Sequence, residues 1–188
     1  MPRMKRWITV LALGAFGALF AAPALAQQSR VSVEGRMGAG LPAGELEDIG
    51  AESGLSLGAD VMYSFSPAVT GYAGLSHDRF GCDEGNGNAC DDRLISSGFQ
   101  TGLKFLLSSS STGLPWIRAG LIGQDLDTGQ TESDLSLGVE AGAGIDINVG
   151  PNFLIVPAIQ ARGYSADMGP GDVDVRYLVF SIGGHVHF

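Results

Sequence analysis

Residues 134–149, DLSLGVEAGAGIDINV, alternate between apolar residues and polar or small ones along their whole length. Alternation with a period of two places successive side chains on opposite faces of an extended strand. One face carries Leu135, Leu137, Val139, Ala141, Ala143, Ile145, Ile147 and Val149. A strand in a soluble sandwich usually has about 5–6 residues. The length here instead favours a tilted membrane strand of about 9–11 residues that is extended at both rims.

The same alternation recurs along the chain, and the connections between the segments differ in length. The eight alternating segments are residues 30–41, 53–65, 68–78, 93–107, 115–124, 134–149, 153–165 and 175–188. The short connections lie near residues 66, 110 and 151, and the long ones are residues 42–52, 79–92, 125–133 and 166–174. Short turns on one side and long loops on the other are typical of outer-membrane barrels. We therefore predict an all-β fold, an eight-stranded antiparallel up-and-down transmembrane β-barrel with its long loops outside.

Residues 1–26 are predicted to be a cleaved signal peptide. A basic segment with Arg3, Lys5 and Arg6 precedes an apolar run, and Ala24-Leu25-Ala26 offers a cleavage site. A retained membrane helix is the alternative, but the apolar run is shorter than the roughly 20 residues that a spanning helix needs. We therefore expect residues 27–188 to form the mature outer-membrane barrel.

The mature chain is acidic. Removal of three basic signal residues leaves eight Lys and Arg against twenty Asp and Glu, so the net charge changes from −9 to −12. Nucleic acid is not expected as a partner, because phosphate binding needs a basic face. Fifteen of the twenty acids lie in or beside the long loops: Glu45, Glu47, Asp48, Glu52, Asp83, Glu84, Asp91, Asp92, Asp125, Asp127, Glu132, Asp134, Asp167, Asp172 and Asp174.

Charged residues also occur on the face that the alternation assigns to the lumen. They are Glu34, Arg36, Asp60, Lys104, Arg118, Glu140, Asp146 and Arg162. A charge facing lipid at mid-membrane costs roughly 2–4 kcal/mol, whereas a charge in the lumen can form an ion pair. The tight turn at residues 150–152 predicts that Glu140 lies opposite Arg162. On adjacent strands, Arg36 and Asp60 are expected at similar heights along the barrel axis, and so are Arg118 and Asp146. Position along the axis alone therefore suggests that each of these two pairs could form.

These charge pairs have two interpretations. They fill the lumen as salt bridges, or they line a polar conduit and exchange partners as a gate. Eight strands enclose an interior only just wide enough for side chains, which favours filling.

Cys82 and Cys90 bracket the segment DEGNGNA in the second long loop. An exported location favours oxidation, and the glycines let the loop ends meet, so we predict a Cys82–Cys90 disulfide. Loop-closure entropy suggests that it stabilises the fold by about 2–3 kcal/mol. A calcium site is not favoured, because Gly85 stands where an EF-hand loop needs Asp or Asn.

Aromatic residues gather on the short-turn side, which predicts an interfacial girdle. The residues are Tyr63, Phe65, Phe105, Trp116, Phe153 and Phe188.

The last twelve residues, YLVFSIGGHVHF, keep the alternation to the end of the sequence. One phase carries Phe180, Ile182, Gly184, Val186 and Phe188. This pattern matches the terminal assembly signal of the small eight-stranded outer-membrane β-barrels of Gram-negative bacteria, and the whole mature chain resembles that family. It includes the barrel domain of outer-membrane protein A and the opacity-type surface antigens. Ile182 precedes Gly183 where one variant of the signal has a polar residue, so the subfamily stays open.

The resemblance implies a set of partners. The barrel-assembly machinery recognises the C-terminal strand, outer-membrane lipid and lipopolysaccharide surround the wall, and an extracellular partner contacts the loops. The resemblance also implies a monomer in the Gram-negative outer membrane, reached through the periplasm.

The remaining candidates for chemistry are histidines. His185 and His187 share the lumen phase near Glu34, but a metal site needs a third or fourth ligand, so we interpret them as polar filling. Ser76-His77-Asp78 are three neighbours whose side chains alternate faces and cannot form a triad among themselves. No cofactor and no metal are expected.

The favoured function is therefore that of a non-enzymatic barrel that contributes to envelope integrity and displays acidic loops for adhesion or surface contacts. A narrow channel for ions or small solutes through the polar lumen is the main alternative. A lipid A-modifying barrel enzyme, which the resemblance also allows, is a remote one.

Overall fold

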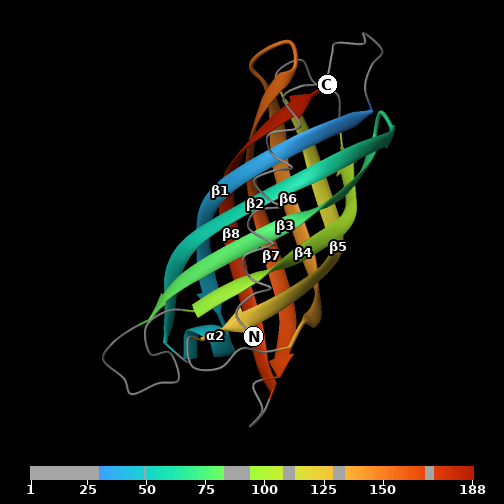
Figure 1. The fold of residues 1–188 in the computed structure, drawn as a ribbon. Helices are drawn as coiled ribbons and strands as arrows, with labels where there is room; N and C mark the ends of the chain where they lie inside the picture. The colour runs from blue at the N-terminus through green and yellow to red at the C-terminus, as the bar shows by residue number, and fades with distance from the viewer. Residues whose placement is uncertain (1–29, 49, 83–93, 108–112, 129–133, 168–171) are drawn as a thin grey trace, which may run out of the picture.

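The computed structural model describes residues 30–48, 50–82, 94–107, 113–128, 134–167 and 172–188. These residues form a closed antiparallel barrel in which each strand pairs with the next and β1 pairs with β8 (Figure 1). The elements are β1 (Val31–Ala43), α2 (Glu45–Asp48), β2 (Ala51–Ser66), β3 (Val69–Cys82), β4 (Leu94–Leu106), β5 (Leu114–Asp127), β6 (Ser136–Asn148), β7 (Phe153–Asp167) and β8 (Asp172–His187). The predicted eight-stranded barrel is confirmed.

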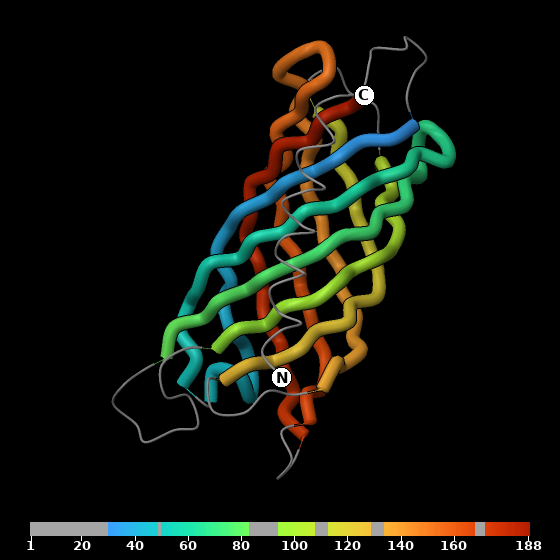
Figure 2. The backbone as a smooth tube through the Cα atoms, in the orientation of Figure 1, coloured from blue at the N-terminus to red at the C-terminus, as the bar shows by residue number. Residues whose placement is uncertain are grey.

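The barrel has two distinct ends. The turn end holds the start of β1, the end of β8 and the turns between β2 and β3 and between β6 and β7, whereas the loop end holds α2 (Figure 1). The strands cross the wall obliquely between these ends (Figure 2). Such a tilt is required to close a sheet into a barrel.

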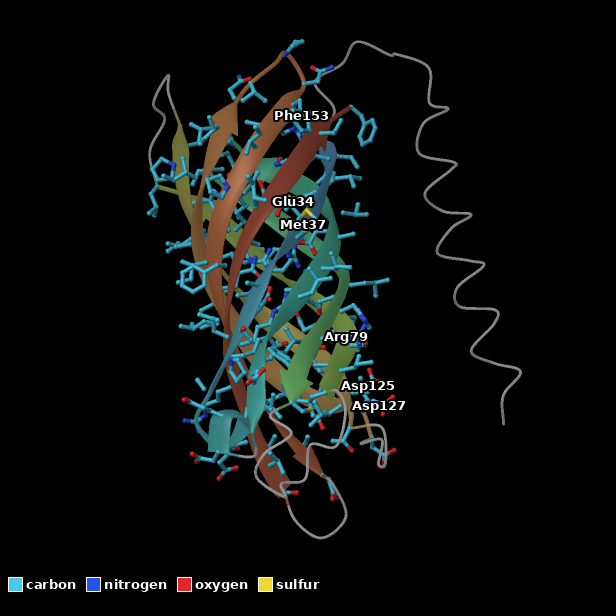
Figure 3. All side chains as sticks on the ribbon, turned by 90° about the vertical axis from the view of Figure 1, so that its left-hand side faces the viewer. Glu34, Met37, Arg79, Asp125, Asp127 and Phe153 are labelled. Atoms are coloured by element: carbon cyan, nitrogen blue, oxygen red, sulfur yellow. The ribbon has the colours of Figure 1, made fainter. Side chains whose placement is uncertain are left out.

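The side chains are distributed in the opposite way to those of a soluble protein. On β1, Glu34 is 2% exposed whereas Met37 is 55% exposed (Figure 3). On β6, Leu137 is 75% exposed whereas Glu140 is 2% exposed. Charged groups inside and large aliphatic groups outside are the arrangement of a transmembrane barrel, whose wall faces hydrocarbon.

The apolar belt on the outer wall ends near the loop end. There Arg79, Asp125 and Asp127 project from the wall (Figure 3). Arg79 and Asp127 flank Ile95 in register across three adjacent strands. Charged residues of both signs on the outward phase mark a polar rim, because they would be costly at mid-membrane.

The short helix α2 lies at the loop end of the barrel (Figure 1). Within the described ranges, no helix has the length and apolar character needed to cross a membrane. The short helix α2 instead inserts Leu46, which is fully buried, into an apolar cluster at the loop end of the lumen. The cluster contains Leu46, Ala51, Phe80, Leu94, Ile122, Leu126, Tyr164, Ala166, Val175, Tyr177 and Val179. We call this cluster the loop-end plug.

The strands reach further toward the loop end than the sequence predicted. β5 includes Asp125 and Asp127, and β8 begins at Asp172, so these acids lie in paired strands rather than in loops. There the outward phase becomes acidic while the inward phase stays apolar, as with buried Leu126 between Asp125 and Asp127. The apolar outer face that marks a membrane strand therefore ends before the backbone pairing does. Residues 1–26 and Cys90 lie outside the described residues, so the signal peptide and the Cys82–Cys90 disulfide stay predictions.

One member of the predicted aromatic girdle was placed on the wrong face. Trp116 is 2% exposed and packs inside the barrel with Leu154 and Val156. It shares its phase with Arg118, two residues later, so the lumen is the face that strand geometry gives it. Tyr63 and Phe65 do lie on the outer wall, with their rings 5.2 Å apart in an edge-to-face contact.

Candidate functional site: the charged lumen

The middle of the lumen holds a continuous network of buried ionic and polar contacts. Its first centre is Asp60, whose carboxylate accepts hydrogen bonds from Arg36, Gln100 and Arg118. The contact between Arg118 Nη1 and Asp60 Oδ2 measures 3.2 Å. Asp60 is therefore a buried carboxylate with three donors from three different strands.

Glu140 is the second centre. It accepts a hydrogen bond of 2.8 Å from the Tyr72 hydroxyl and lies 3.1 Å from Arg118 Nη2. Arg162 Nε reaches its other oxygen at 3.3 Å. Arg118 therefore bridges the two carboxylates of Asp60 and Glu140.

Asp78 is the third centre, closer to the loop end. Its Oδ2 accepts from Arg162 Nη1 at 2.7 Å and from the Tyr177 hydroxyl at 2.8 Å. Arg162 also donates to Gln100 at 2.9 Å, which connects the second and third centres back to the first. We call this set the central network; its members are Arg36, Asp60, Tyr72, Asp78, Gln100, Arg118, Glu140, Arg162 and Tyr177. One or more members come from each of the eight described strands.

The network is electrically balanced. Three guanidinium groups face three carboxylates, and each of these six side chains is at most 3% exposed. A buried charge is tolerated only when it is paired and hydrogen-bonded. The balance therefore pairs the six charges of the central network, while buried Glu34, outside it, lies 3.9 Å from Arg36 Nη1.

A separate ion pair lies toward the turn end. Lys104 Nζ donates to both oxygens of Asp146 at 2.8 Å and sits 4.5 Å from the centre of the Trp116 ring. This contact combines an ion pair with a cation–π interaction.

The structure brings together two of the three charge pairs considered from the sequence. Glu140 and Arg162 lie directly opposite in the register of β6 and β7 and are 3.3 Å apart. Arg36 contacts Asp60, although the residue directly opposite Arg36 is Gly58. A side chain at Gly58 would meet the Arg36 guanidinium at 2.8 Å, so glycine leaves the space in which this arginine lies across the strand.

The pairing of Arg118 with Asp146 is wrong. Leu114, not Arg118, lies opposite Asp146 in the register of β5 and β6. Lys104 lies directly opposite Arg118 on β4, so two like charges must separate. Arg118 contacts Asp60 and Glu140, whereas Lys104 takes Asp146.

The comparisons with known proteins concern the fold. No family model matches the chain, and no curated protein matches it either. Among solved structures, Neisserial surface protein A has a TM-score of 0.65 at 17% identity, over 85% of this chain and 98% of that one. The chain has the fold of the small eight-stranded outer-membrane β-barrels.

Two further solved outer-membrane proteins are similar in fold to this chain. OprG from Pseudomonas aeruginosa has a TM-score of 0.53 at 12% identity, covering 86% of this chain and 98% of that one. Outer membrane protein W from E. coli has a TM-score of 0.52 at 15% identity, covering 87% and 100%. Identities this low carry the architecture and not the activity.

Sequence reasoning missed several members of the barrel's central network. Asp78 was placed at the end of a strand, whereas β3 continues to Cys82 and points Asp78 into the lumen. Its phase was readable, because Tyr72, Ser76 and Asp78 are separated by even steps. Tyr72, Gln100 and Tyr177 are neutral and carry no charge signal, yet their inward phase marks them as lumen residues.

The side chains of Ser76, His77 and Asp78 lie on different sides of the barrel wall. Ser76 and Asp78 are buried in the lumen, where Ser76 accepts a hydrogen bond of 2.9 Å from Gln124. His77 is exposed on the outer wall, with its Nδ1 2.8 Å from the Ser97 hydroxyl. These three side chains do not form a catalytic arrangement with one another.

The C-terminal strand presents the two predicted phases. Phe180, Ile182, Val186 and Phe188 are between 37% and 55% exposed on the outer wall. Gly184 lies in the same phase under the ring of Phe153, which would be 3.1 Å from a side chain placed there. His185 is 4% exposed and lies opposite Glu34 on β1, with its ring 4.4 Å from that of His187.

Proposed function

We propose that this chain is a non-enzymatic barrel of the Gram-negative outer membrane that contributes to envelope integrity and displays acidic groups for adhesion or other surface contacts. The observation that carries the proposal is the filled interior. The central network joins the eight strands across the lumen, and the loop-end plug covers it with fully buried Leu46, Phe80 and Leu126. An interior of this kind favours a mechanical role over solute passage.

The loop end supports the second half of the proposal. Glu47 and Asp48 on α2 are exposed, as is Asp172 at the start of β8. Loops facing outward would present this acidic surface to the medium, where it attracts cationic surfaces and repels anionic ones. The C-terminal strand and the apolar wall are the surfaces for the assembly machinery and for outer-membrane lipid and lipopolysaccharide.

The test compares cells that lack the gene with cells that carry it on a plasmid. Deletion is expected to increase sensitivity to an anionic detergent, and the wild-type gene is expected to restore resistance. A variant with Glu47→Gln, Asp48→Asn and Asp172→Asn should restore resistance but reduce retention of cells on amine-coated glass. Unchanged detergent sensitivity after deletion would refute the integrity role, and unchanged retention would refute the surface-contact role.

A narrow channel is the second candidate. The observation that favours it is a cavity of about 520 Å³ that enters the lumen at the turn end and reaches Lys104 and Asp146. Conduction requires the central network and the loop-end plug to open as well. A lipid A-modifying activity has less support, because Ser76 and Asp78 face the lumen while His77 faces outward. An unchanged lipid A mass spectrum with and without the protein would eliminate it.

A further inference from the structure

The outer wall of the barrel carries an apolar hollow over β6, β7, β8 and β1. Its lining combines two short outward side chains, Ala143 and Pro157, with the longer side chains of Met37, Ile159 and Ile182. The hollow has a volume of about 730 Å³. Met37 and Ile182 are each 55% exposed, so it opens toward the hydrocarbon that surrounds a transmembrane barrel. We call it the wall hollow.

The wall hollow reaches the backbone of the barrel wall. Gly144 and Ala158, which belong to the inward phases of β6 and β7, also line it. On the lumen side, a side chain at Gly144 would lie 2.4 Å from Cζ2 of Trp116, so the indole packs directly against the inner face of the wall. The hollow is therefore a site on the bilayer side of the wall, separate from the turn-end cavity.

Pro157 interrupts the hydrogen bonding of the wall at this place. The register of β6 and β7 is the same on both sides of it, yet Ile145 and Pro157 do not pair in the ladder. The Val149 N–H donates to the Phe153 carbonyl at 3.2 Å, and hydrogen-bonded pairs recur at every second residue of an antiparallel ladder. The Ile145 carbonyl should therefore accept from residue 157, but proline has no N–H to donate.

This carbonyl lies inside the apolar belt. Ile147 and Val149 continue the outward apolar phase of Ile145 toward the turn and are 36% and 51% exposed. The four steps from Ile145 to Val149 span about 13 Å of strand. A backbone acceptor without its donor is costly at that depth, because hydrocarbon offers no hydrogen bond. Ile145 and Pro157 both line the wall hollow, so a molecule in the hollow can reach this acceptor.

We propose that the wall hollow binds a membrane lipid whose hydrocarbon chain carries a hydroxyl group. The chain packs against Met37, Ile159 and Ile182, and the hydroxyl donates to the Ile145 carbonyl in place of the N–H that Pro157 lacks. A hydroxyl on the chain matches the depth of this carbonyl, whereas a polar head group stays at the interface. Because the site lies on the outer wall, it does not depend on whether the lumen conducts.

The Ile145 carbonyl can be observed on its own by NMR. Ile145-Asp146 is the only Ile-Asp dipeptide in the sequence, so isoleucine labelled with ¹³C at the carbonyl, combined with ¹⁵N-aspartate, gives a single HNCO signal. A hydrogen bond to a carbonyl oxygen moves its ¹³C resonance to higher frequency. The full chain refolded into phosphatidylcholine nanodiscs therefore reports directly whether this acceptor is occupied.

Three probes with the same hydrocarbon chain separate the hydroxyl from the chain. Methyl 10-hydroxystearate is expected to move the signal saturably to higher frequency. Methyl 10-oxostearate, which is polar but cannot donate, and methyl stearate should each give at least a tenfold smaller shift. Equal shifts from the hydroxy and oxo probes, or no shift from the hydroxy probe, would overturn the proposal.

Two variants test the named residues. Pro157→Ala restores the N–H opposite Ile145, so its signal should lie at the hydrogen-bonded frequency without any probe and should hardly respond to methyl 10-hydroxystearate. Ala143→Leu fills the hollow and should weaken binding of this probe at least tenfold. Ala73→Leu, at an exposed alanine on the outer face of β3, is the matched control and should respond as wild type does. A wild-type response from Pro157→Ala or from Ala143→Leu would show that the probe does not bind in the hollow, and the proposal would be wrong.

Discussion

Replacing Arg162 with methionine removes one guanidinium from the middle of the central network while keeping a long side chain. Arg162 donates to Asp78 at 2.7 Å, to Glu140 at 3.3 Å and to Gln100 at 2.9 Å. After the change, Glu140 still has Arg118 and Tyr72, but Asp78 keeps only Tyr177 among the network donors. Asp78 is fully buried, so the variant leaves a carboxylate in the lumen without a cation.

Removal of one partner from a buried ion pair typically costs about 3–5 kcal/mol, because the remaining charge is uncompensated. We expect Arg162→Met to lower the free energy of unfolding by about that amount. The double variant Arg162→Met with Asp78→Leu removes both charges and should recover part of the loss, with a coupling energy of about 1–3 kcal/mol.

Urea titration of the barrel refolded into lipid vesicles measures these free energies, with the loss of heat-modifiable mobility on gels as a second readout. Arg176→Ala is the matched control. Arg176 and Asp174 form an ion pair at 3.0 Å, but their side chains are 69% and 49% exposed, so the change should cost less than about 1 kcal/mol. If Arg162→Met costs no more than Arg176→Ala, the central network does not hold the barrel together and the reasoning fails.

Three other perturbations address separate features. Leu46→Ala should lower the free energy of unfolding by about 2–4 kcal/mol, because Leu46 is fully buried in the loop-end plug; an unaltered urea midpoint would contradict its role. The mature protein should show no thiol that reacts with maleimide under denaturing conditions until it is reduced; labelling of Cys82 and Cys90 without reductant would exclude the disulfide. Deletion of Phe188 should lower the amount of folded barrel in the outer membrane and raise the unfolded fraction in the periplasm; normal levels on membrane fractionation would argue against an assembly signal.

The strands and their faces were predictable because a two-residue period is a geometric property of extended chain. Leu137 and Glu140 lie on opposite faces of β6 in both the pattern and the structure. The strand ends at the loop end were not predictable in the same way. Asp125, Asp127 and Asp172 continue paired strands where lipid no longer selects one apolar face.

The two-residue period alone does not predict which side chains contact each other in the lumen. Phase determines which residues point inward, but register and side-chain reach determine which of them meet. The tight turn at residues 150–152 set the register of Glu140 and Arg162, so that contact was accessible from the sequence. Lys104 and Asp146 are on β4 and β6, two strands apart, and height alone gave no reason to prefer Lys104 over Arg118.

Planar-bilayer recording of the purified barrel tests most directly the claim that the interior is filled. The central network and the loop-end plug predict a baseline without reproducible conductance steps, for the wild-type protein at neutral pH and moderate salt. Reproducible steps that change in size or frequency in Arg162→Met would show that ions pass through the network, and would contradict the account of this protein as a closed barrel.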